Sequence, residues 1–458
     1  MSSEHFHTVV VGGGIAGLAC AHRLARELGR DRVRLLEASD YLGGHVRTTH
    51  EQGYQLDWGP NGFLDREPQM LEWIRELGLE GELIQANQAA ARRFLMIKGK
   101  LVELVGPPKF LVAPLLSVAG RTRLLMEPLI PAKRGDAPES VFDFAARRIG
   151  REAAEILVSA MVLGIFGGDA KQLSLQHCFP RMAAMEREHG GLFKAMLAKK
   201  RSGSGGPMGP GGTLTTLRGG IGRLAERVAE QLGEVAQTSS VVTGIEKTSE
   251  GFVVHCGRAG ARPSQVRCEK LVLAVPGYVA AELMRDLAVE AAERFGSLKY
   301  ASLAVVCTAF PRERVRHDLN GFGYLVPPRE KRETLGCLWT TSIFPGAGPE
   351  GQVLLRSMLG GAMHPDLVER SDEELLSIVK RDVFDLLGAS GTPEFVRIFR
   401  HRIAIPQYEL EHGEVLHAAD EAERAHPGLY FAGNAFRGVA MIDCVMDAFR
   451  VAERILAR

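Results

Sequence analysis

The residues that decide the fold lie near the start of the chain, in the sequence Thr8-Val9-Val10-Val11-Gly12-Gly13-Gly14-Ile15-Ala16-Gly17. A run of β-branched residues that breaks into glycines is typical of a buried strand turning sharply into a helix. Gly12 permits the tight turn, Gly14 lets the backbone approach a ligand, and Gly17 lets the helix pack closely on the strand. Because the start of a helix offers free N–H groups to an anion, this stretch predicts a dinucleotide pyrophosphate site that includes Ile15 and Ala16.

A second strand and an acidic residue support this prediction. The apolar run Val33–Leu36 ends in Glu37, followed by Ala38, at the distance that the fold requires for an acid that grips a ribose diol. The alternative is an ordinary strand-helix-strand unit with a glycine turn, which would bind no nucleotide. Glu37 and Ala38 are therefore predicted to contact the cofactor.

The composition limits the classes of function. The chain has 458 residues, 45% of them hydrophobic, which is enough for about three domains. Its formal net charge is +1, so no global field attracts nucleic acid or an anionic membrane. Seven cysteines without a C-x-x-C pair argue against a zinc site or a disulfide framework and fit a reducing, cytoplasmic setting. The first residues lack the pattern of a signal peptide.

A glycine doublet, Gly43-Gly44, follows the ribose-binding acid, as in the second phosphate loop of two-dinucleotide-binding flavoproteins. Such loops usually carry an arginine on each side of the doublet, where this chain has Tyr41 and His45. We expect Arg47 to supply the missing charge, and the alternative is that Arg47 is simply solvated.

Two further stretches complete the predicted cofactor site. Gly59, Pro60 and Asn61 belong to a segment whose residues let the backbone lie close to a planar ring. Near the other end of the chain, a strand ends in Gly433-Asn434, and a helix is expected over 441–456. The start of that helix would direct N–H groups and a positive dipole at the flavin edge that gains charge on reduction. Val439, Ala440 and Met441 are predicted to line this edge.

The middle of the chain predicts two other regions. Residues 89–212 are rich in helical patterns, but no apolar run reaches the ~18 residues needed to span a bilayer. They form either a cap over a pocket or an amphipathic lobe on a membrane, with five cations at the headgroups: Lys109, Arg121, Arg123, Lys133 and Arg134. Within this region, residues 199–212 have the composition of a mobile linker. Apolar strands between residues 301 and 359 predict a sheet that forms one wall of a cavity.

These motifs resemble those of the oxygen-dependent protoporphyrinogen oxidases of the bacterial type, within the amine-oxidase-like flavoprotein superfamily. The resemblance runs from end to end. Besides the glycine turn, it is carried by Gly59-Pro60-Asn61-Gly62-Phe63-Leu64, Gly164-Ile165-Phe166-Gly167-Gly168-Asp169, Gly321-Phe322-Gly323-Tyr324-Leu325-Val326-Pro327, Ile405-Pro406-Gln407-Tyr408 and Gly433-Asn434-Ala435-Phe436-Arg437-Gly438-Val439.

The resemblance implies an α/β (α+β overall) fold of three parts. A Rossmann-like FAD-binding domain would comprise residues 1–88, 213–284 and 413–458. A helical, membrane-associated domain would comprise 89–212, and a β-sheet substrate domain 285–412.

It also implies site residues. By position, Arg93 resembles an arginine that meets a substrate propionate, and Gly164 a glycine that borders the macrocycle. Leu325 and Leu338 resemble aliphatic residues that sandwich a pyrrole ring, Met358 the hydrophobe opposite, and Val242 a residue whose backbone contacts the adenine. The alternative for the aliphatic residues is plain core packing. Ala440 departs from the family pattern, which usually has glycine there, and Cys444 invites comparison with the covalent flavin of monoamine oxidases.

The family binds FAD non-covalently and converts protoporphyrinogen IX to protoporphyrin IX by three two-electron hydride transfers to flavin N5. Since the flavin performs the chemistry, we expect no catalytic side chain and no metal. The implied partners are oxygen or a quinone, the cytoplasmic membrane surface, a second copy of the chain, and ferrochelatase, with no nucleic acid. Three alternatives stay open: coproporphyrinogen III oxidation, amine or carotenoid oxidation, and a flavin-binding scaffold without turnover.

Overall fold

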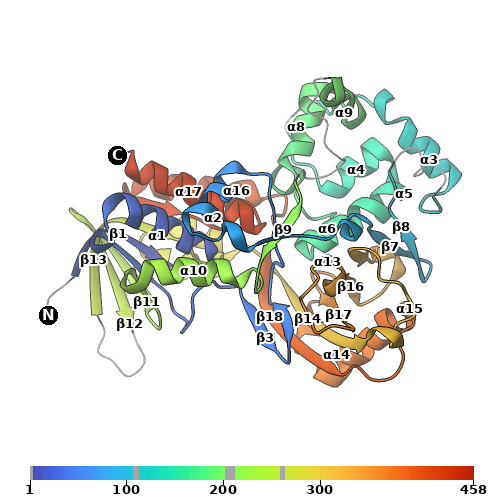
Figure 1. The fold of residues 1–458 in the computed structure, drawn as a ribbon. Helices are drawn as coiled ribbons and strands as arrows, with labels where there is room; N and C mark the ends of the chain where they lie inside the picture. Colours follow the sequence, from blue (N-terminus) through green and yellow to red (C-terminus); the bar gives the residue numbers. More distant parts are fainter. Residues whose placement is uncertain (1–3, 107–112, 136, 202–211, 258–263, 458) are drawn as a thin grey trace.

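The computed structural model describes residues 4–106, 113–135, 137–201, 212–257 and 264–457. It has three regions (Figure 1): a sheet flanked by helices, a second sheet, and a helical lobe above the second sheet. Helices and strands are mixed along the chain, which confirms the predicted fold class.

The first sheet has the strand order β10-β2-β1-β13-β12-β11, and β19 pairs with β13 beyond the end of β12. Strands β10, β2, β1, β13 and β19 run parallel, whereas β11 and β12 form an antiparallel extension. Its strands are β1 (Glu4–Val11), β2 (Val33–Leu36), β10 (Ala236–Gln237), β11 (Val241–Thr248), β12 (Gly251–Gly257), β13 (Ser264–Leu273) and β19 (Leu429–Phe431).

Alternate side chains of β1 enter cores on the two faces of this sheet. Val10 packs with α1 (Ile15–Leu28), α10 (Gly222–Leu232) and α17 (Met441–Leu456). Val9 and Val11 pack with α11 (Gly277–Met284), α12 (Val289–Gly296) and α16 (His412–Ala425). Because both faces of the sheet are covered, the buried part of β1 is a continuous run of apolar residues, which is the pattern that predicted this strand. Helices α1 and α17 pack side by side (Figure 1), so the first and last helices of the chain belong to one layer.

The second sheet has the order β18-β14-β17-β16-β15-β7-β8 and is antiparallel except between β15 and β7. One face is covered by α14 (Asp372–Val379), which continues through a π-helical segment to α15 (Asp385–Leu387). Its strands are β7 (Phe94–Ile97), β8 (Lys100–Glu103), β14 (Tyr300–Pro311), β15 (Gly323–Leu325), β16 (Thr334–Trp339), β17 (Gln352–Gly360) and β18 (Phe395–Pro406).

The helical lobe packs on β7 and has cores of its own. Its helices are α3 (Val118–Leu125), α4 (Val141–Ile149), α5 (Arg151–Ala153), α6 (Ser159–Phe166), α7 (Leu175–Cys178), α8 (Pro180–His189) and α9 (Leu192–Arg201). Over the described residues, no helix is both long enough and apolar enough to cross a bilayer.

Smaller elements join these regions. The strand pair β3 (Thr48–Glu51) and β4 (Tyr54–Asp57) was not predicted, nor was the sheet of β5 (Phe63–Leu64), β9 (Leu214–Leu217) and β6 (Leu83–Gln85). The remaining helices are α2 (Pro68–Glu76) and α13 (Thr340–Ile343).

Several predicted boundaries of domains and of the linker differ from the structure. The hairpin β7–β8, which the predicted domain limits place in the helical lobe, joins the second sheet by pairing with β15. Helix α12, assigned to the substrate domain, packs in the core of the first sheet. The predicted linker begins too early, because α9 continues to Arg201; residues 202–211 lie outside the described part. The division into three domains thus remains a proposal.

Candidate functional site

The glycine turn after β1 forms an open cradle. Gly12 has φ +103°, and a Cβ at Gly17 would lie 1.8 Å from the Gly12 carbonyl oxygen, so both positions require glycine. A Cβ at Gly14, by contrast, would have no atom within 4 Å. Gly14 is the N-cap residue of α1 and has no side chain to accept hydrogen bonds, so the first N–H groups of this helix are available to an anion placed there.

Glu37 lies against this turn. Its Oε2 accepts a hydrogen bond from the backbone of Gly13 at 2.6 Å, and its Oε1 accepts from the backbone and hydroxyl of Ser39 at 2.8 and 2.6 Å. The backbone oxygen of Glu37 accepts from Ser240 at 2.8 Å, which places the start of β11, with Val242, beside Glu37 and Ala38. The predicted ribose and adenine contacts are therefore neighbours.

The second glycine loop meets the first. The backbone N–H of Gly43 donates to Gly13 at 2.8 Å, and a Cβ on Gly44 would lie 3.3 Å from the Cα of Gly14. Both residues of the doublet have positive φ, so side chains would be strained here. The chain thus brings Gly43 and Gly44 to the glycine turn, and their contact with a phosphate remains a prediction.

Arg47 lies between two aromatic rings. Its guanidinium carbon is 4.5 Å from the ring centre of Tyr41 and 4.4 Å from that of Trp58. Among the described residues no carboxylate pairs with Arg47, so the rings fix the group while its charge stays uncompensated. Tyr41, which stands where an arginine was expected, therefore helps to hold the arginine at position 47.

The C-terminal box closes on the same place. A Cβ on Gly433 would lie 3.5 Å from the Cβ of Ala16, and the Gly433 backbone donates to Asp447 of α17 at 3.1 Å. Asn434 accepts a 2.6 Å hydrogen bond from the Tyr408 hydroxyl. Val439 and Ala440 precede Met441, the first residue of α17, and Ala440 is its exposed N-cap. Both ends of the chain therefore build one site.

The Gly59-Pro60-Asn61 segment links this site to the second sheet. A Cβ on Gly59 would lie 2.6 Å from the His45 carbonyl oxygen, so the segment lies directly on the second glycine loop. From the other side, Arg356 of β17 donates to the Gly59 oxygen at 2.6 Å.

The predicted substrate residues share one face of the second sheet. Leu325 pairs with Gly336, and Gly336 pairs with Met358, while Leu338 pairs with Arg356 two residues away. Paired residues and residues two apart point to the same side of a sheet, so Leu325, Leu338 and Met358 lie on one face. This is the face from which the Arg356 side chain reaches the Gly59 oxygen. Gly164 of α6 contacts this face, because a Cβ there would lie 2.6 Å from a methyl carbon of Leu325.

Arg93 lies at the edge of the same face. Its guanidinium carbon is 5.1 Å from the ring centre of Phe322, which packs in one cluster with Leu338 and Met358. Arg93 is exposed, partial desolvation lowers the pKa of its guanidinium, and no described carboxylate forms an ion pair with it. The adjacent Arg92, by contrast, is paired with Glu103 at 2.9 Å.

Comparisons with known proteins agree with this arrangement. Residues 15–456 match the family of flavin containing amine oxidoreductases. The chain therefore belongs to the flavin-containing amine oxidoreductase family. It is 31% identical to protoporphyrinogen oxidase 1 of Arabidopsis thaliana over 98% of this chain and 87% of that one. It is also 29% identical to the coproporphyrinogen III oxidase of Bacillus subtilis over 97% of both chains. The crystal structure of a protein assigned as a protoporphyrinogen oxidase from Exiguobacterium has a TM-score of 0.84 and 25% identity, with full coverage of both chains.

The cradle fits the FAD of this family of flavoenzymes. The space at Gly14 and the uncapped start of α1 suit a pyrophosphate, and the Glu37 carboxylate, held by three hydrogen bonds, retains lone pairs for a ribose diol. We assign FAD contacts to the residues that the chain gathers here: Gly12, Gly14, Ile15, Ala16, Gly17, Glu37, Ala38, Gly43, Gly44, Arg47, Gly59, Pro60, Asn61, Val242, Gly433, Asn434, Val439, Ala440 and Met441. This assignment is a proposal.

Two residues beside the candidate FAD site, His401 and Arg356, were not predicted from the sequence. His401 of β18 lies 3.0 Å from the Trp58 carbonyl oxygen through its Nε2, and its ring centre is 5.1 Å from that of His45. Burial and His45 lower the pKa of His401 to about 4, so the ring is neutral at physiological pH. Arg356 holds the neighbouring carbonyl of Gly59. No local pattern indicated either residue, because each acts on a loop some 300 positions earlier in the chain.

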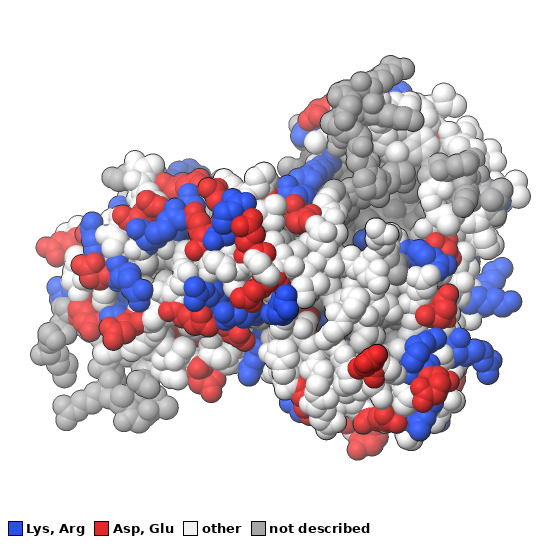
Figure 2. Space-filling model, in the orientation of Figure 1, with Lys and Arg blue, Asp and Glu red and all other residues white. Residues whose placement is uncertain are grey.

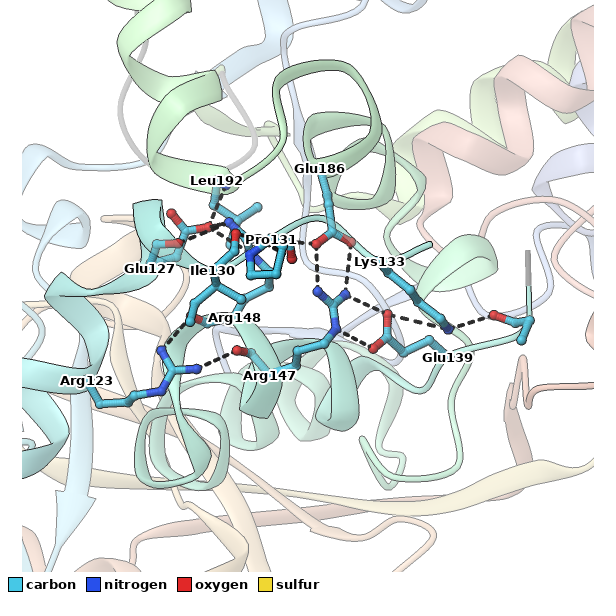
Figure 3. Close-up of polar contacts among 11 residues, drawn as sticks. Arg123, Glu127, Ile130, Pro131, Lys133, Glu139, Arg147, Arg148, Glu186 and Leu192 are labelled. Carbon is cyan, nitrogen blue, oxygen red and sulfur yellow. Dashed lines mark hydrogen bonds and ion pairs between the residues drawn. The ribbon is translucent and has the colours of Figure 1, made fainter. Parts of the chain in front are cut away.

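The polar network of the helical lobe corrects the expected headgroup contacts (Figure 3). Arg123 donates to the backbone oxygens of Arg147 and Arg148 at the end of α4, and Arg121 donates to those of Ala113 and Leu116. Lys133 donates to Ala137 and lies 3.8 Å from Glu139. These three cations therefore serve the fold of the lobe rather than a headgroup layer. Arg134 is exposed, and Lys109 lies outside the described residues.

At the centre of this network, Arg148 and Glu127 form a fully buried ion pair. Glu127 also accepts from the backbones of Leu192 and Phe193 at 2.8 and 3.2 Å, at the start of α9. Arg147 bridges Glu139 and Glu186 at 2.9 and 2.7 Å. The network joins α4, α8 and α9, so its role is structural (Figure 3).

Proposed function

We propose that this protein is an FAD-dependent oxidase that converts protoporphyrinogen IX to protoporphyrin IX in haem biosynthesis. The observation that carries the proposal is Arg93, an exposed cation without a carboxylate partner among the described residues, beside an apolar sheet face. A tetrapyrrole with propionate side chains has this combination of a broad apolar body and an anionic edge. The names of the relatives, protoporphyrinogen and coproporphyrinogen III oxidases, support the same substrate class.

In this proposal the protein orients the substrate and supplies no general base. Leu325, Leu338 and Met358 contact the tetrapyrrole body, Gly164 borders it, and Arg93 binds a propionate. FAD held in the cradle would supply a two-electron acceptor at N5, and conversion to the porphyrin would need three such oxidations, each with release of a proton and reoxidation of the flavin by the electron acceptor.

Coproporphyrinogen III is the nearest alternative substrate, because the Bacillus subtilis relative carries that name. Coproporphyrinogen III has four propionates, so an enzyme that binds it is expected to place several unpaired cations around the apolar sheet face. On this face the guanidinium group of Arg356 is engaged by the Trp58 and Gly59 carbonyls. Arg93 has no carboxylate partner among the described residues, and one such cation suits the substrate with fewer carboxylates.

An anaerobic titration separates an oxidase of porphyrinogens from the other classes. If the proposal holds, protoporphyrinogen IX bleaches the absorbance of the bound flavin with no more than one equivalent of substrate per flavin, and primary amines do not. Bleaching by amines alone would indicate an amine oxidase, and no bleaching by any of these would indicate a scaffold. Oxygen uptake during turnover, with and without an added quinone, identifies the electron acceptor.

We further propose that FAD is bound non-covalently. Cys444 is the thiol that invites a covalent link, but burial raises its pKa to about 12, so it is a poor nucleophile. Acid precipitation of the protein should therefore release all of the flavin into the supernatant.

For the place of action we propose the cytoplasmic face of a membrane. Six large apolar side chains among the described residues of the helical lobe are exposed, among them Val118 (78%) and Leu129 (77%); the others are Leu125, Met126, Ile165 and Leu197. Figure 2 shows that acidic and basic residues alternate over the first-sheet region. Co-sedimentation with lipid vesicles should fall for Val118→Ser/Leu129→Ser. A homodimer and a contact with ferrochelatase remain predictions.

A further inference from the structure

The backbone conformation at Gly164 is one that any residue can adopt, so it does not explain why glycine stands there. It lies inside helix α6, where alanine would stabilise the helix. Its φ is not in the left-handed region; that conformation is taken by Gly167, which ends the helix with φ +59°. The reason for glycine at 164 must therefore lie in what a side chain would meet.

The three atoms nearest to a side chain at 164 would all belong to Leu325. An alanine Cβ would lie 2.6 and 3.0 Å from the two methyl carbons of Leu325 and 3.4 Å from its Cγ. On the other side of the same leucine, a Cβ on Gly336 would lie 3.2 Å from one of these methyl carbons. The Leu325 side chain is thus received between two glycines, one from α6 and one from β16.

The two glycines differ in what they protect. A Cβ on Gly336 would also lie 2.4 Å from the backbone oxygen of Tyr324, so glycine is needed there by the sheet itself. The three atoms nearest to a Cβ on Gly164, by contrast, are all side-chain atoms of Leu325. Leu325 is only partly buried, so its side chain can shift away from such a Cβ.

We propose that Gly164 is a positioning residue. Because it has no side chain, Leu325 can pack against α6, and the position of Leu325 sets the width of the space between α6 and the sheet face that the substrate would occupy. The proposal rests on the proposed function. A porphyrinogen has sp³ methylene bridges and is puckered, whereas the porphyrin product is flat. A slot narrowed by displacement of Leu325 therefore rejects the substrate more strongly than the product.

The experiment compares Gly164→Ala, Leu325→Val and the double variant in the FAD-loaded full chain. The control is Gly296→Ala in α12, a helical glycine whose Cβ would meet only the Ala281 Cβ at 3.6 Å. Gly164→Ala should raise KM for protoporphyrinogen about tenfold while the inhibition constant of protoporphyrin changes less. Because valine lacks the outer carbons that clash, the double variant should return to the KM of Leu325→Val. The control should match the wild type.

Two outcomes would overturn the proposal: an unchanged KM in Gly164→Ala, or a double variant whose KM change is the product of the two single changes. A wild type that oxidises no porphyrinogen would refute the proposed function instead. In that case the unfolding midpoints of the wild type, the two single variants and the double variant test whether Gly164 and Leu325 interact. Additive shifts would show that they do not.

Discussion

The guanidinium carbon of Arg93 lies 5.1 Å from the ring centre of Phe322, and no described carboxylate pairs with it. The ring fixes the cation at the edge of the apolar face without neutralising it. Arg93 and its neighbour Arg92, which is paired with Glu103, therefore form a natural comparison.

Arg93→Ala should raise KM for the porphyrinogen by about 10- to 100-fold, because a charge-assisted hydrogen bond to a propionate is lost. Flavin content should stay unchanged, since Arg93 is not among the residues of the FAD cradle. Arg92→Ala, the matched control, should alter KM by no more than about twofold. Equal effects of the two substitutions in steady-state kinetics would contradict the assigned role.

Arg47→Ala should weaken FAD retention about tenfold, because the cradle loses a fixed positive charge. Arg47→Lys keeps the charge but loses the planar stack between Tyr41 and Trp58, so its flavin affinity should be intermediate. The measurement is the dissociation constant of FAD for the apoprotein by fluorescence quenching. If Arg47→Ala retains flavin as well as the wild type does, the assignment fails.

Two buried histidines should make stability depend on pH. Burial lowers the pKa of His401 and of His412 to about 4 each. The unfolded chain takes up protons near pH 6.5 and the folded chain only near pH 4, so stability present above pH 6.5 is lost as the pH falls. At pH 5 the loss should be about 2 kcal/mol for each histidine.

Urea unfolding at pH 7.5 and 5, with excess FAD, tests this. His401→Gln should remove its share of the difference, whereas His417→Gln, at a side chain that is 69% exposed, should leave it unchanged. A pH dependence that is identical in all three proteins would refute the role of His401.

The buried ion pair of the helical lobe should be intolerant of a single change. Arg148→Met leaves Glu127 charged and fully buried, so it should lower the free energy of unfolding by about 3–5 kcal/mol. Arg151→Ala breaks the exposed pair with Glu155 and should cost less than about 0.5 kcal/mol. Chemical denaturation of both variants measures the difference, and equal costs would contradict the structural role of the network.

The parts of this molecule that could be predicted from sequence are those whose cause is local. The turn from Gly12 to Gly17 and the helix Met441–Leu456 follow from glycine conformation and helical periodicity, and both agree with the structure. Glu37 could be placed because its distance from the turn is set by one strand-helix-strand unit.

What could not be predicted depends on contacts between distant segments. The burial pattern of β18 is irregular, partly because a bulge interrupts its pairing with β14, so neither the strand nor His401 was foreseen. The stack of Arg47 between Tyr41 and Trp58 requires the unpredicted β3–β4 pair, which returns Trp58 to the loop. The sequence left open whether Arg121 and Arg123 lie in a pocket cap or at a membrane, because nothing in it showed that backbone oxygens would engage them.

The most direct test of the central claim is porphyrin fluorescence after the FAD-loaded protein is mixed, separately, with protoporphyrinogen IX and coproporphyrinogen III. We predict rapid formation of protoporphyrin IX and a kcat/KM for coproporphyrinogen III at least about tenfold lower. The reverse preference would show that this chain is a coproporphyrinogen oxidase. No porphyrin from either substrate would contradict the account of the site.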